Sequence, residues 1–127
     1  MSAAVEIVSF GYLHDAPPAA HMTLDLRHHF RDPHVSPELR HMTAHDLPVR
    51  RAVLTTPGIS DLVTAAALAT LAFSDGPSTG RIVLAVGCAG GRHRAATVAM
   101  AVADRIRKSG LHVDLTHRDL DKAVLDR

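Results

Sequence analysis

One short stretch of the sequence combines the residue types that bind a phosphate group. It runs from Arg81 to Arg94 and reads RIVLAVGCAGGRHR: an apolar run rich in β-branched residues, then three glycines and three basic residues. The glycines permit a tight turn and a close approach of the backbone to a ligand. A helical pattern begins near Arg92, and a helix N-terminus attracts anions through its N–H groups and its dipole. Because basic side chains oppose that dipole unless an anion is bound, the stretch predicts a phosphate-sized anion site with Arg92, His93 and Arg94 as donors.

The spacing of Cys88, Gly91 and Arg94 leaves a catalytic interpretation open. Cys-x-x-Gly-x-x-Arg is the spacing of the phosphate loop in cysteine-dependent phosphatases, whose thiolate is the nucleophile. Three carboxyl groups are candidates for the acid that protonates the leaving group: Asp15, Asp32 and Asp46. Gly87 and Ala95 stand where such enzymes usually have His and Ser or Thr. A plain strand-to-helix turn with solvated basic side chains is the remaining alternative.

A second polar group lies earlier in the chain. Residues 22–27 alternate apolar and polar side chains, which predicts a strand with Asp25 and Arg27 on one face near its carboxyl end. Ligands of α/β sheets gather beyond these ends, so the two residues either orient sugar hydroxyls or a phosphate, or form a plain salt bridge. Residues 28–47 contain two prolines and many polar side chains, with a helical turn expected only near Pro37–Arg40. Their scattered apolar residues indicate that the segment packs down as a binding loop over the site.

The remaining periodicities predict an α/β fold. Further strands are expected at residues 5–10, 82–86 and 111–116. Helices are expected near residues 48–54, from Thr56 as N-cap and Pro57 as first residue through Phe73, and over residues 95–108, with a turn at residues 74–80. The last strand–helix–strand unit predicts parallel strands through a right-handed crossover. We therefore predict a mostly parallel sheet flanked by helices, with a glycine-rich phosphate loop between a central strand and a helix.

Length and composition restrict the class of protein. The 127 residues, 46% hydrophobic and 21% charged, suit one soluble globular domain over residues 1–127. The sequence contains no run of 18 apolar residues, so no membrane span is expected. A single cysteine excludes an internal disulfide, which fits a cytoplasmic location. Seven of the ten histidines precede residue 46, but only His41 and His45 have helical His-x3-His spacing. Without an acidic partner in the usual place, they predict no metal site.

Charge is distributed unevenly along the chain. The net charge of +1 argues against a generic nucleic-acid binder. Residues 1–80 carry five basic and eight acidic side chains, whereas residues 81–127 carry nine and five. The basic half fits a phosphorylated ligand and also permits RNA as a partner. Four side chains would then contribute to RNA binding: Arg105, Arg107, Lys108 and Arg118.

Eight motifs, spread over roughly residues 8 to 122, together resemble one known family. They are Phe10-Gly11-Tyr12, Asp25-Leu26-Arg27, Asp32-Pro33-His34, Pro37-Glu38-Leu39-Arg40, Met42-Thr43, Pro48-Val49-Arg50, VGCAGGRHR at 86–94, and His117-Arg118-Asp119-Leu120. They resemble the C-terminal domain of the RNase adapter protein RapZ. Members of that family commonly carry an N-terminal P-loop NTPase domain, so this chain looks like a stand-alone version of the C-terminal domain.

The resemblance implies an α/β domain that binds glucosamine-6-phosphate, forms homo-oligomers and, in enterobacterial members, delivers a small regulatory RNA to a ribonuclease. Ligand contacts carried over by position fall on ten residues: Asp25, Arg27, His34, Arg40, Thr43, Ala89, Gly90, Gly91, His93 and Arg94. Ala89 replaces a threonine of the family loop, which removes one hydroxyl contact. Leu13 replaces a basic residue of the enterobacterial members, and their Lys/Arg-rich tail is missing, which weakens the attraction for an RNA backbone.

Together these observations predict a non-enzymatic sensor of a phosphorylated small molecule, either an amino-sugar phosphate or a nucleotide. It would need no cofactor and would have a regulatory or RNA-adapter role. The alternatives are a cysteine-dependent phosphatase that uses Cys88 and Arg94, and an adapter that binds RNA or a regulated protein through its basic half.

Overall fold

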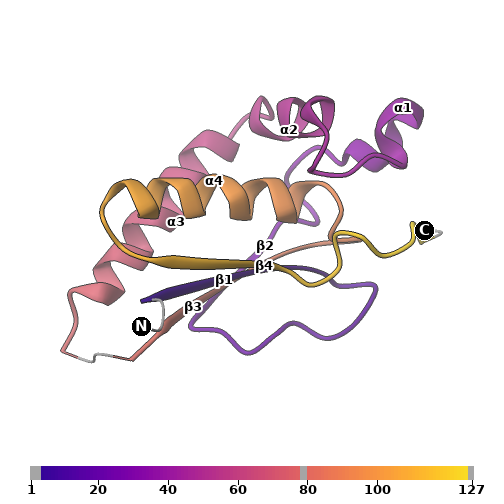
Figure 1. The fold of residues 1–127 in the computed structure, drawn as a ribbon. Helices are drawn as coiled ribbons and strands as arrows, with labels where there is room; N and C mark the ends of the chain where they lie inside the picture. Colours follow the sequence, from indigo (N-terminus) through magenta and orange to yellow (C-terminus); the bar gives the residue numbers. More distant parts are fainter. Residues whose placement is uncertain (1–3, 78–79, 126–127) are drawn as a thin grey trace.

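The computed structural model describes residues 4–77 and 80–125, and four of their segments form one parallel sheet (Figure 1). The strands are β1 (Val5–Gly11), β2 (Met22–Asp25), β3 (Ile82–Cys88) and β4 (Val113–His117). Their order across the sheet is β2-β3-β1-β4, and every neighbouring pair is parallel. The helical elements are η1 (Pro33–Val35), α1 (Pro37–Arg40), α2 (Leu47–Leu54), α3 (Ile59–Ser74) and α4 (Arg94–Lys108).

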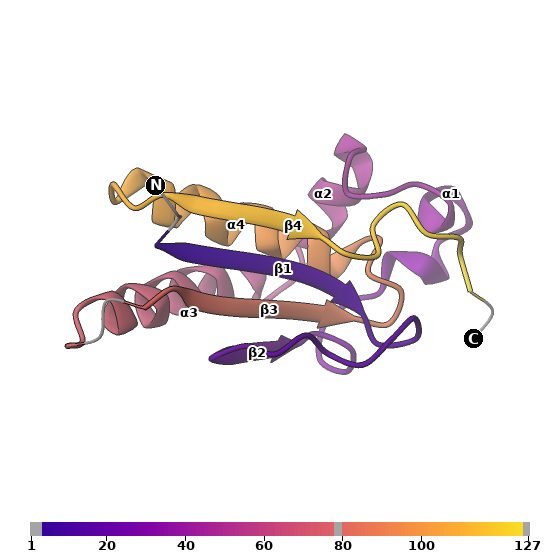
Figure 2. The same ribbon diagram turned by 60° about the horizontal axis from the view of Figure 1, so that its bottom comes forward.

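The helices gather on one face of the sheet, and the long connection from β1 to β2 crosses the other face (Figures 1 and 2). All strands run in one direction, so their carboxyl ends meet at one edge, where α1, α2 and the beginning of α4 also lie (Figure 2). The predicted α/β class and the parallel sheet with flanking helices are confirmed. The structure does not establish that the glycine-rich loop binds phosphate.

The main core lies between the sheet and α3 and α4. Ile7, Leu84 and Val86 of the two central strands are fully buried against Val98 and Val102 of α4. The apolar positions of α4 recur at helical spacing, so one stripe of the helix faces the sheet and the other side remains polar. No single helix among the described residues has the length and apolarity of a membrane span, although α2 and α3 reach both as a pair bent by 85° at the break between them.

Two predicted boundaries differ from the structure for local reasons. The strand expected through Arg27 ends at Asp25, because the Asp25 carboxylate accepts a hydrogen bond from the Arg27 main-chain N–H and turns the chain. The helix expected to start at Thr56-Pro57 begins at Ile59, capped by Gly58 at a φ of 92°. The Thr56 hydroxyl donates instead to the Ala52 carbonyl at the end of α2, so it is not available as a cap.

Two further expectations from the sequence concern the segment 28–47 and the turn at 74–80. The segment 28–47, expected to be irregular apart from one turn, contains both η1 and α1 and the first residue of α2. Residues 78–79 of the predicted turn at 74–80 lie outside the described residues.

The end of β1 touches the glycine-rich loop so closely that no side chain fits between them. A Cβ on Gly11 would lie 2.4 Å from the carbonyl carbon of Gly90, and main-chain atoms cannot easily move away. We predict that Gly11→Ala lowers the free energy of unfolding by about 2–3 kcal/mol, measured by urea denaturation. Gly76→Ala is the control, since the nearest atom to its Cβ is the Phe73 oxygen at 3.2 Å. Equal losses in the two variants would contradict this account of the loop's packing.

Candidate functional site

The glycine-rich loop lies where the chain leaves two neighbouring strands in opposite directions. From β1 the chain runs across β3 to reach β2, and from β3 it runs through α4 across β1 to reach β4. Such a divergence at the carboxyl ends of parallel strands is where α/β proteins bind ligands. The two exits are joined here, since the N–H groups of Tyr12 and Leu13 donate to the carbonyls of Cys88 (2.9 Å) and Ala89 (3.0 Å).

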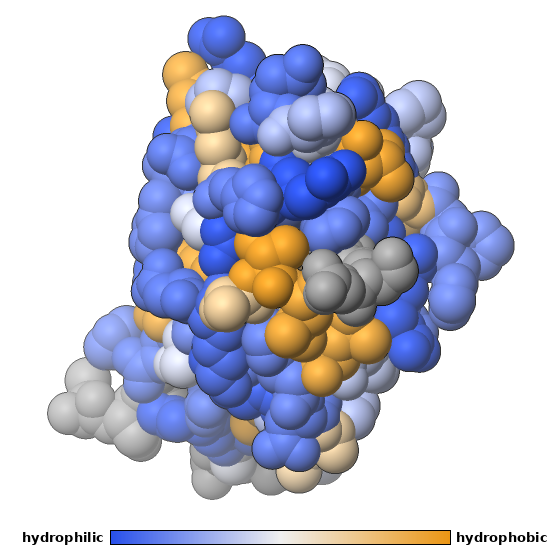
Figure 3. Space-filling view, turned by 90° about the vertical axis from the view of Figure 1, so that its right-hand side faces the viewer, coloured by the Kyte–Doolittle hydropathy of each residue, from blue (hydrophilic) through white to orange (hydrophobic). Residues whose placement is uncertain are grey.

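The surface at this end of the sheet is mixed in character. Figure 3 faces it and shows hydrophilic side chains around an apolar patch near the centre of the view. Segments at this end also carry several of the large exposed apolar side chains: Leu13, Val35, Met42 and Leu47.

Cys88 organises the inside of the loop. Its buried Sγ accepts hydrogen bonds from the N–H groups of Gly91 (3.3 Å) and Ala95 (3.4 Å). Gly91 has a φ of 79°, in the left-handed region that favours glycine, and this turns the chain back toward the start of α4. The thiol therefore acts as a structural acceptor at the centre of the turn.

Several main-chain N–H groups of the loop have no acceptor. Within the part of the chain that the structure describes, four of them donate no hydrogen bond: Ala89, Gly90, Arg92 and His93, hereafter the loop amides. Gly90 and His93 are buried residues, and N–H groups in buried positions ordinarily have partners. The loop amides precede the first residue of α4, so the helix dipole adds to the positive potential that their hydrogens create.

The three basic side chains of the loop bind the protein itself. The guanidinium of Arg94 is 2% exposed, and its Nη1 donates to the carbonyls of Leu26 (2.8 Å), Arg27 (3.1 Å) and Phe30 (3.2 Å). Its Nη2 lies 3.2 Å from a carboxylate oxygen of Asp32. Arg94 thus joins the start of α4 to the chain that follows β2.

His93 and Arg92 hold the next part of the same segment. The Nε2 of His93 lies 3.0 Å and 2.9 Å from the carbonyls of Leu39 and Met42, so this nitrogen carries the proton. Burial lowers the pKa of His93, which keeps its ring neutral at physiological pH. Arg92 donates to the carbonyls of Lys122 and His41, each at 2.7 Å.

These contacts change how the basic residues are understood. The sequence suggested that three cationic groups at a helix N-terminus require an anion, but carbonyl oxygens, the Asp32 carboxylate and a neutral His93 ring meet much of that requirement. The side chains act as clamps between the loop and residues 26–42. What the loop presents beyond these clamps is its main chain.

Asp25 and Arg27 form an ordered pair at the sheet edge. Arg27 donates through Nε and Nη2 to both Asp25 oxygens, at 2.7 to 3.1 Å. The hydrogen bonds from Arg27 lower the pKa of Asp25 to about 2. The Arg27 guanidinium also lies over the Tyr12 ring, with its central carbon 3.7 Å from the ring centroid. Both expectations for the pair remain open, since an exposed salt bridge and a ligand contact are compatible with this geometry.

His34, Arg40 and Thr43 lie in the segment that covers the loop. The His34 carbonyl accepts from Nε of Arg40 at 2.8 Å, and the Thr43 hydroxyl accepts from the His45 N–H at 3.1 Å. Next to them, the Ala44 N–H donates to the Arg92 carbonyl at 2.9 Å. The structure therefore brings all the ligand residues expected from the sequence to one end of the molecule.

The residues expected to bind RNA are not brought together. Arg105, Arg107 and Lys108 are in the last turn of α4, which runs back along the sheet to the amino ends of the strands (Figure 1). Arg118 follows β4 at the carboxyl end and donates to the Ala16 carbonyl at 2.6 Å. The four basic groups thus lie at two ends of the domain rather than on one surface.

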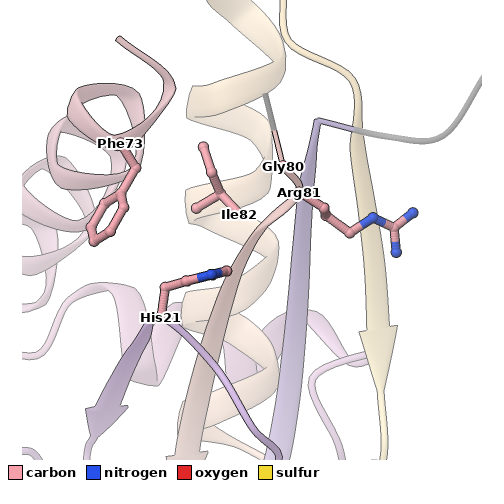
Figure 4. Close-up of a pocket in the computed structure, with 5 residues that line it drawn as sticks. All are labelled: His21, Phe73, Gly80, Arg81 and Ile82. Atoms are coloured by element: carbon pink, nitrogen blue, oxygen red, sulfur yellow. The ribbon is translucent and has the colours of Figure 1, made fainter. Parts of the chain in front are cut away.

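A small cavity of about 160 Å³ lies at the amino ends of the strands, away from the loop (Figure 4). Phe73, Ile82 and His21 face it, whereas Arg81 extends away and pairs with Glu6. None of the predicted ligand residues lines this cavity. Among the described residues, no three His, Cys, Asp or Glu side chains are grouped to hold a metal ion.

Asp119 is an important residue that the sequence analysis did not identify as part of the site. It is fully buried, and it accepts hydrogen bonds from the Gly11 N–H (2.7 Å) and Arg118 Nε (3.0 Å), with the Lys122 ammonium 2.6 Å away. Burial alone would raise its pKa, but the hydrogen bonds from Arg118, Lys122 and Gly11 lower it to about 2. Asp119 thus fixes the end of β1 beside the loop. Its motif was visible in the sequence, but its partner at Gly11 was not.

Comparison with known proteins agrees with this architecture. The family model described as the RapZ C-terminal domain matches residues 3–121. The chain belongs to the RapZ C-terminal domain family. It is 39% identical over 119 residues to a nucleotide-binding protein of Thermobifida fusca, covering 91% of this chain and 40% of the relative.

Two further relatives show lower identity to the chain. The chain is 35% identical over 127 residues to a nucleotide-binding protein of Sphingopyxis alaskensis, covering 96% of this chain and 39% of the relative. It is 31% identical over 122 residues to one of Limosilactobacillus reuteri, covering 94% and 42%. The chain thus spans about 40% of the length of the curated relatives that it matches. Within this family, the glycine-rich loop and its clamps make up the candidate site of the present chain.

The lowered pKa of Asp119 predicts a specific dependence of stability on pH. Because the folded pKa of about 2 lies below the ordinary value of 3.8, the ionised carboxylate stabilises the fold above about pH 4. This contribution, about 2 kcal/mol, is lost as the pH falls toward 2. We predict that Asp119→Asn lowers the free energy of unfolding at pH 7 by about that amount, and that the difference from wild type shrinks between pH 4 and 2.

Denaturation with urea at a series of pH values measures this difference. Asp121→Asn is the matched control, because the Asp121 side chain is 82% exposed and its contact with His45 is long, at 3.4 Å. The control should change stability by less than about 0.5 kcal/mol at every pH. A constant difference between wild type and Asp119→Asn across this range would argue against an ionised, hydrogen-bonded Asp119.

Proposed function

We propose that this domain is a non-enzymatic binding module for a phosphorylated small molecule, a nucleotide or an amino-sugar phosphate. The phosphate would accept hydrogen bonds from the loop amides at the N-terminus of α4. The observation that carries the proposal is that these four main-chain donors, two of them in buried residues, have no acceptor among the described residues. Oriented N–H groups at a helix N-terminus form anion sites without help from basic side chains.

Position and kinship also support the proposal. The loop amides lie where the chain diverges after β1 and β3, the usual ligand position in α/β sheets. The curated relatives are called nucleotide-binding proteins, and nucleotides are ligands that contain phosphate.

A regulatory role follows from the clamps. A ligand on the loop amides would contact the same loop whose side chains hold residues 26–42. Ligand binding would therefore stabilise that covering segment, and a protein or RNA partner could read its state. A protein partner is favoured for this chain, since the basic residues expected for RNA lie at two ends of the domain.

Backbone NMR tests the phosphate position directly. We predict that phosphate, AMP or glucosamine-6-phosphate shifts the loop amides strongly, because each would gain a charged acceptor. The amides of Gly91 and Ala95 should shift less, since they already donate to Cys88 Sγ. Glucosamine without phosphate is the control ligand and should leave all of these signals in place. Shifts confined to other parts of the chain would contradict the proposed site.

Catalysis by Cys88 is the second candidate function, and one observation favours it. Cys88 Sγ lies at the N-terminal end of α4, where two N–H groups point at it, a position that catalytic cysteines also occupy. The thiolate would attack phosphorus, an acid would protonate the departing alcohol, and water would release the phosphate. Two observations oppose it: Cys88 is 2% exposed, and the Arg94 guanidinium is bound to carbonyls instead of facing a substrate.

The two candidate functions differ in what Cys88→Ser does. Under the binding proposal, neither the wild type nor Cys88→Ser releases a burst of phenol from an aryl phosphate, and both bind phosphate ligands with affinities within about threefold, since a hydroxyl can accept the same two N–H bonds. Burst-phase absorbance and calorimetry measure these outcomes. A stoichiometric burst that disappears in the variant would establish the phosphatase instead.

A further inference from the structure

The ring of Tyr12 is held rigidly beside the loop. It packs edge-on against Phe10, with ring centroids 4.8 Å apart and an interplanar angle of 61°. It also lies over Gly87, where an added Cβ would come within 2.6 Å of the Tyr12 ring. The absence of a side chain at this position of β3 thus makes room for an aromatic ring from the β1–β2 connection.

Arg27 forms a second planar layer on that ring. Its guanidinium lies 3.7 Å from the centroid of Tyr12, and hydrogen bonds to both oxygens of Asp25 fix its orientation. The Arg27 side chain nevertheless remains 37% exposed. The ring of Tyr12 and the Asp25 carboxylate thus hold the guanidinium in one orientation while leaving part of it open to a ligand.

One edge of the guanidinium also remains available. Arg27 Nε and Nη2 donate to Asp25, whereas Nη1 has no acceptor among the described residues. No other aromatic ring of the described chain lies on Arg27, so the face opposite Tyr12 is not stacked. The group therefore offers a flat cationic surface and an N–H edge together.

This surface adjoins the proposed phosphate position. Asp25 pairs in register with Gly87, the residue before Cys88, and the Tyr12 N–H donates to the Cys88 carbonyl. The Ala89 amide, first of the loop amides, follows directly. A ligand with its phosphate on the loop amides would therefore lie close to the planar layers of Tyr12 and Arg27.

We propose that a nucleobase stacks on the outer face of Arg27, supported from below by Tyr12, so that the phosphorylated ligand of this domain is a nucleotide. The proposal rests on the proposed function, because the phosphate is placed on the loop amides. Guanidinium groups and aromatic rings stack on bases because both present flat, polarisable faces, and a sugar ring presents none. The Nη1 edge would donate to a ring nitrogen or carbonyl of the base.

Calorimetry with matched ligands tests the stacking. AMP and ribose-5-phosphate share the sugar and phosphate and differ by the base, so their affinity ratio isolates the base contribution. Wild type is expected to bind AMP about tenfold more tightly, the scale of one base stack. Arg27→Lys keeps the charge but loses the plane, so it should bring the ratio close to one while leaving ribose-5-phosphate affinity within about twofold.

Two control variants and two further tests accompany this variant. Arg31→Lys makes the same exchange nearby at an exposed arginine and should retain the tenfold ratio. Tyr12→Phe keeps the ring and should retain it, whereas Tyr12→Ser should lose it. Because Tyr12 is the single tyrosine of the chain, its ring NMR signals report directly and should shift with AMP but not with ribose-5-phosphate.

The remaining outcomes distinguish a failure of the base-stacking proposal from a failure of the proposed phosphate binding. Equal affinities for AMP and ribose-5-phosphate in wild type would overturn base stacking and leave the phosphate site standing. A preference for AMP that survives both Arg27→Lys and Tyr12→Ser would move the base elsewhere and overturn this assignment. If no phosphorylated compound binds, the proposed function itself is wrong and the stacking proposal with it.

Discussion

The buried guanidinium of Arg94 is the interaction on which the carboxyl end of this fold depends. A charge this deep requires partners, and it has three main-chain carbonyls from residues 26–30 and the carboxylate of Asp32. These acceptors belong to a segment without regular structure until η1 begins. One side chain of α4 therefore fixes the path of the chain after β2, and with it the position of Arg27.

Close backbone contacts complete the same region. Gly11 and Gly91 lie so near each other that neither tolerates a side chain, and the Asp119 carboxylate accepts the Gly11 N–H beside them. The exits of β1 and β3 are thereby fixed as one unit. Within that unit the loop amides keep their orientation while lacking acceptors in the described part of the chain, which is the preorganisation that an anion site requires.

Local signals in the sequence predicted the local parts of this structure. The β-branched run, the glycines and the apolar stripe of α4 indicated β3, the turn and the helix, although β3 continues to Cys88, two residues beyond its predicted end. The direction of the Arg94 side chain was not predictable, because its acceptors come from residues 26–32, more than sixty positions earlier. The same holds for the stacking of Arg27 on Tyr12, which depends on how a loop crosses the sheet.

The cap of α3 and the order of the strands also could not be predicted from local sequence patterns. Thr56 is a residue type that often caps helices, but its hydroxyl donates to a carbonyl of the preceding helix, and Gly58 is the cap of α3 instead. Apolar alternation identified four strands but carried no information on their neighbours, so the central position of β1 became known only from its pairing with β3 and β4.

That central position has a consequence for the order in which the domain can form during synthesis. Within this domain β1 is made before its partners, and among the described residues it pairs with 82–88 and 113–117, so both of its edges stay open until most of the domain has been translated. Contacts so distant along the chain form slowly, and an unpaired apolar strand is prone to associate with other chains. While the domain is being synthesised, β1 is therefore the element most in need of a chaperone.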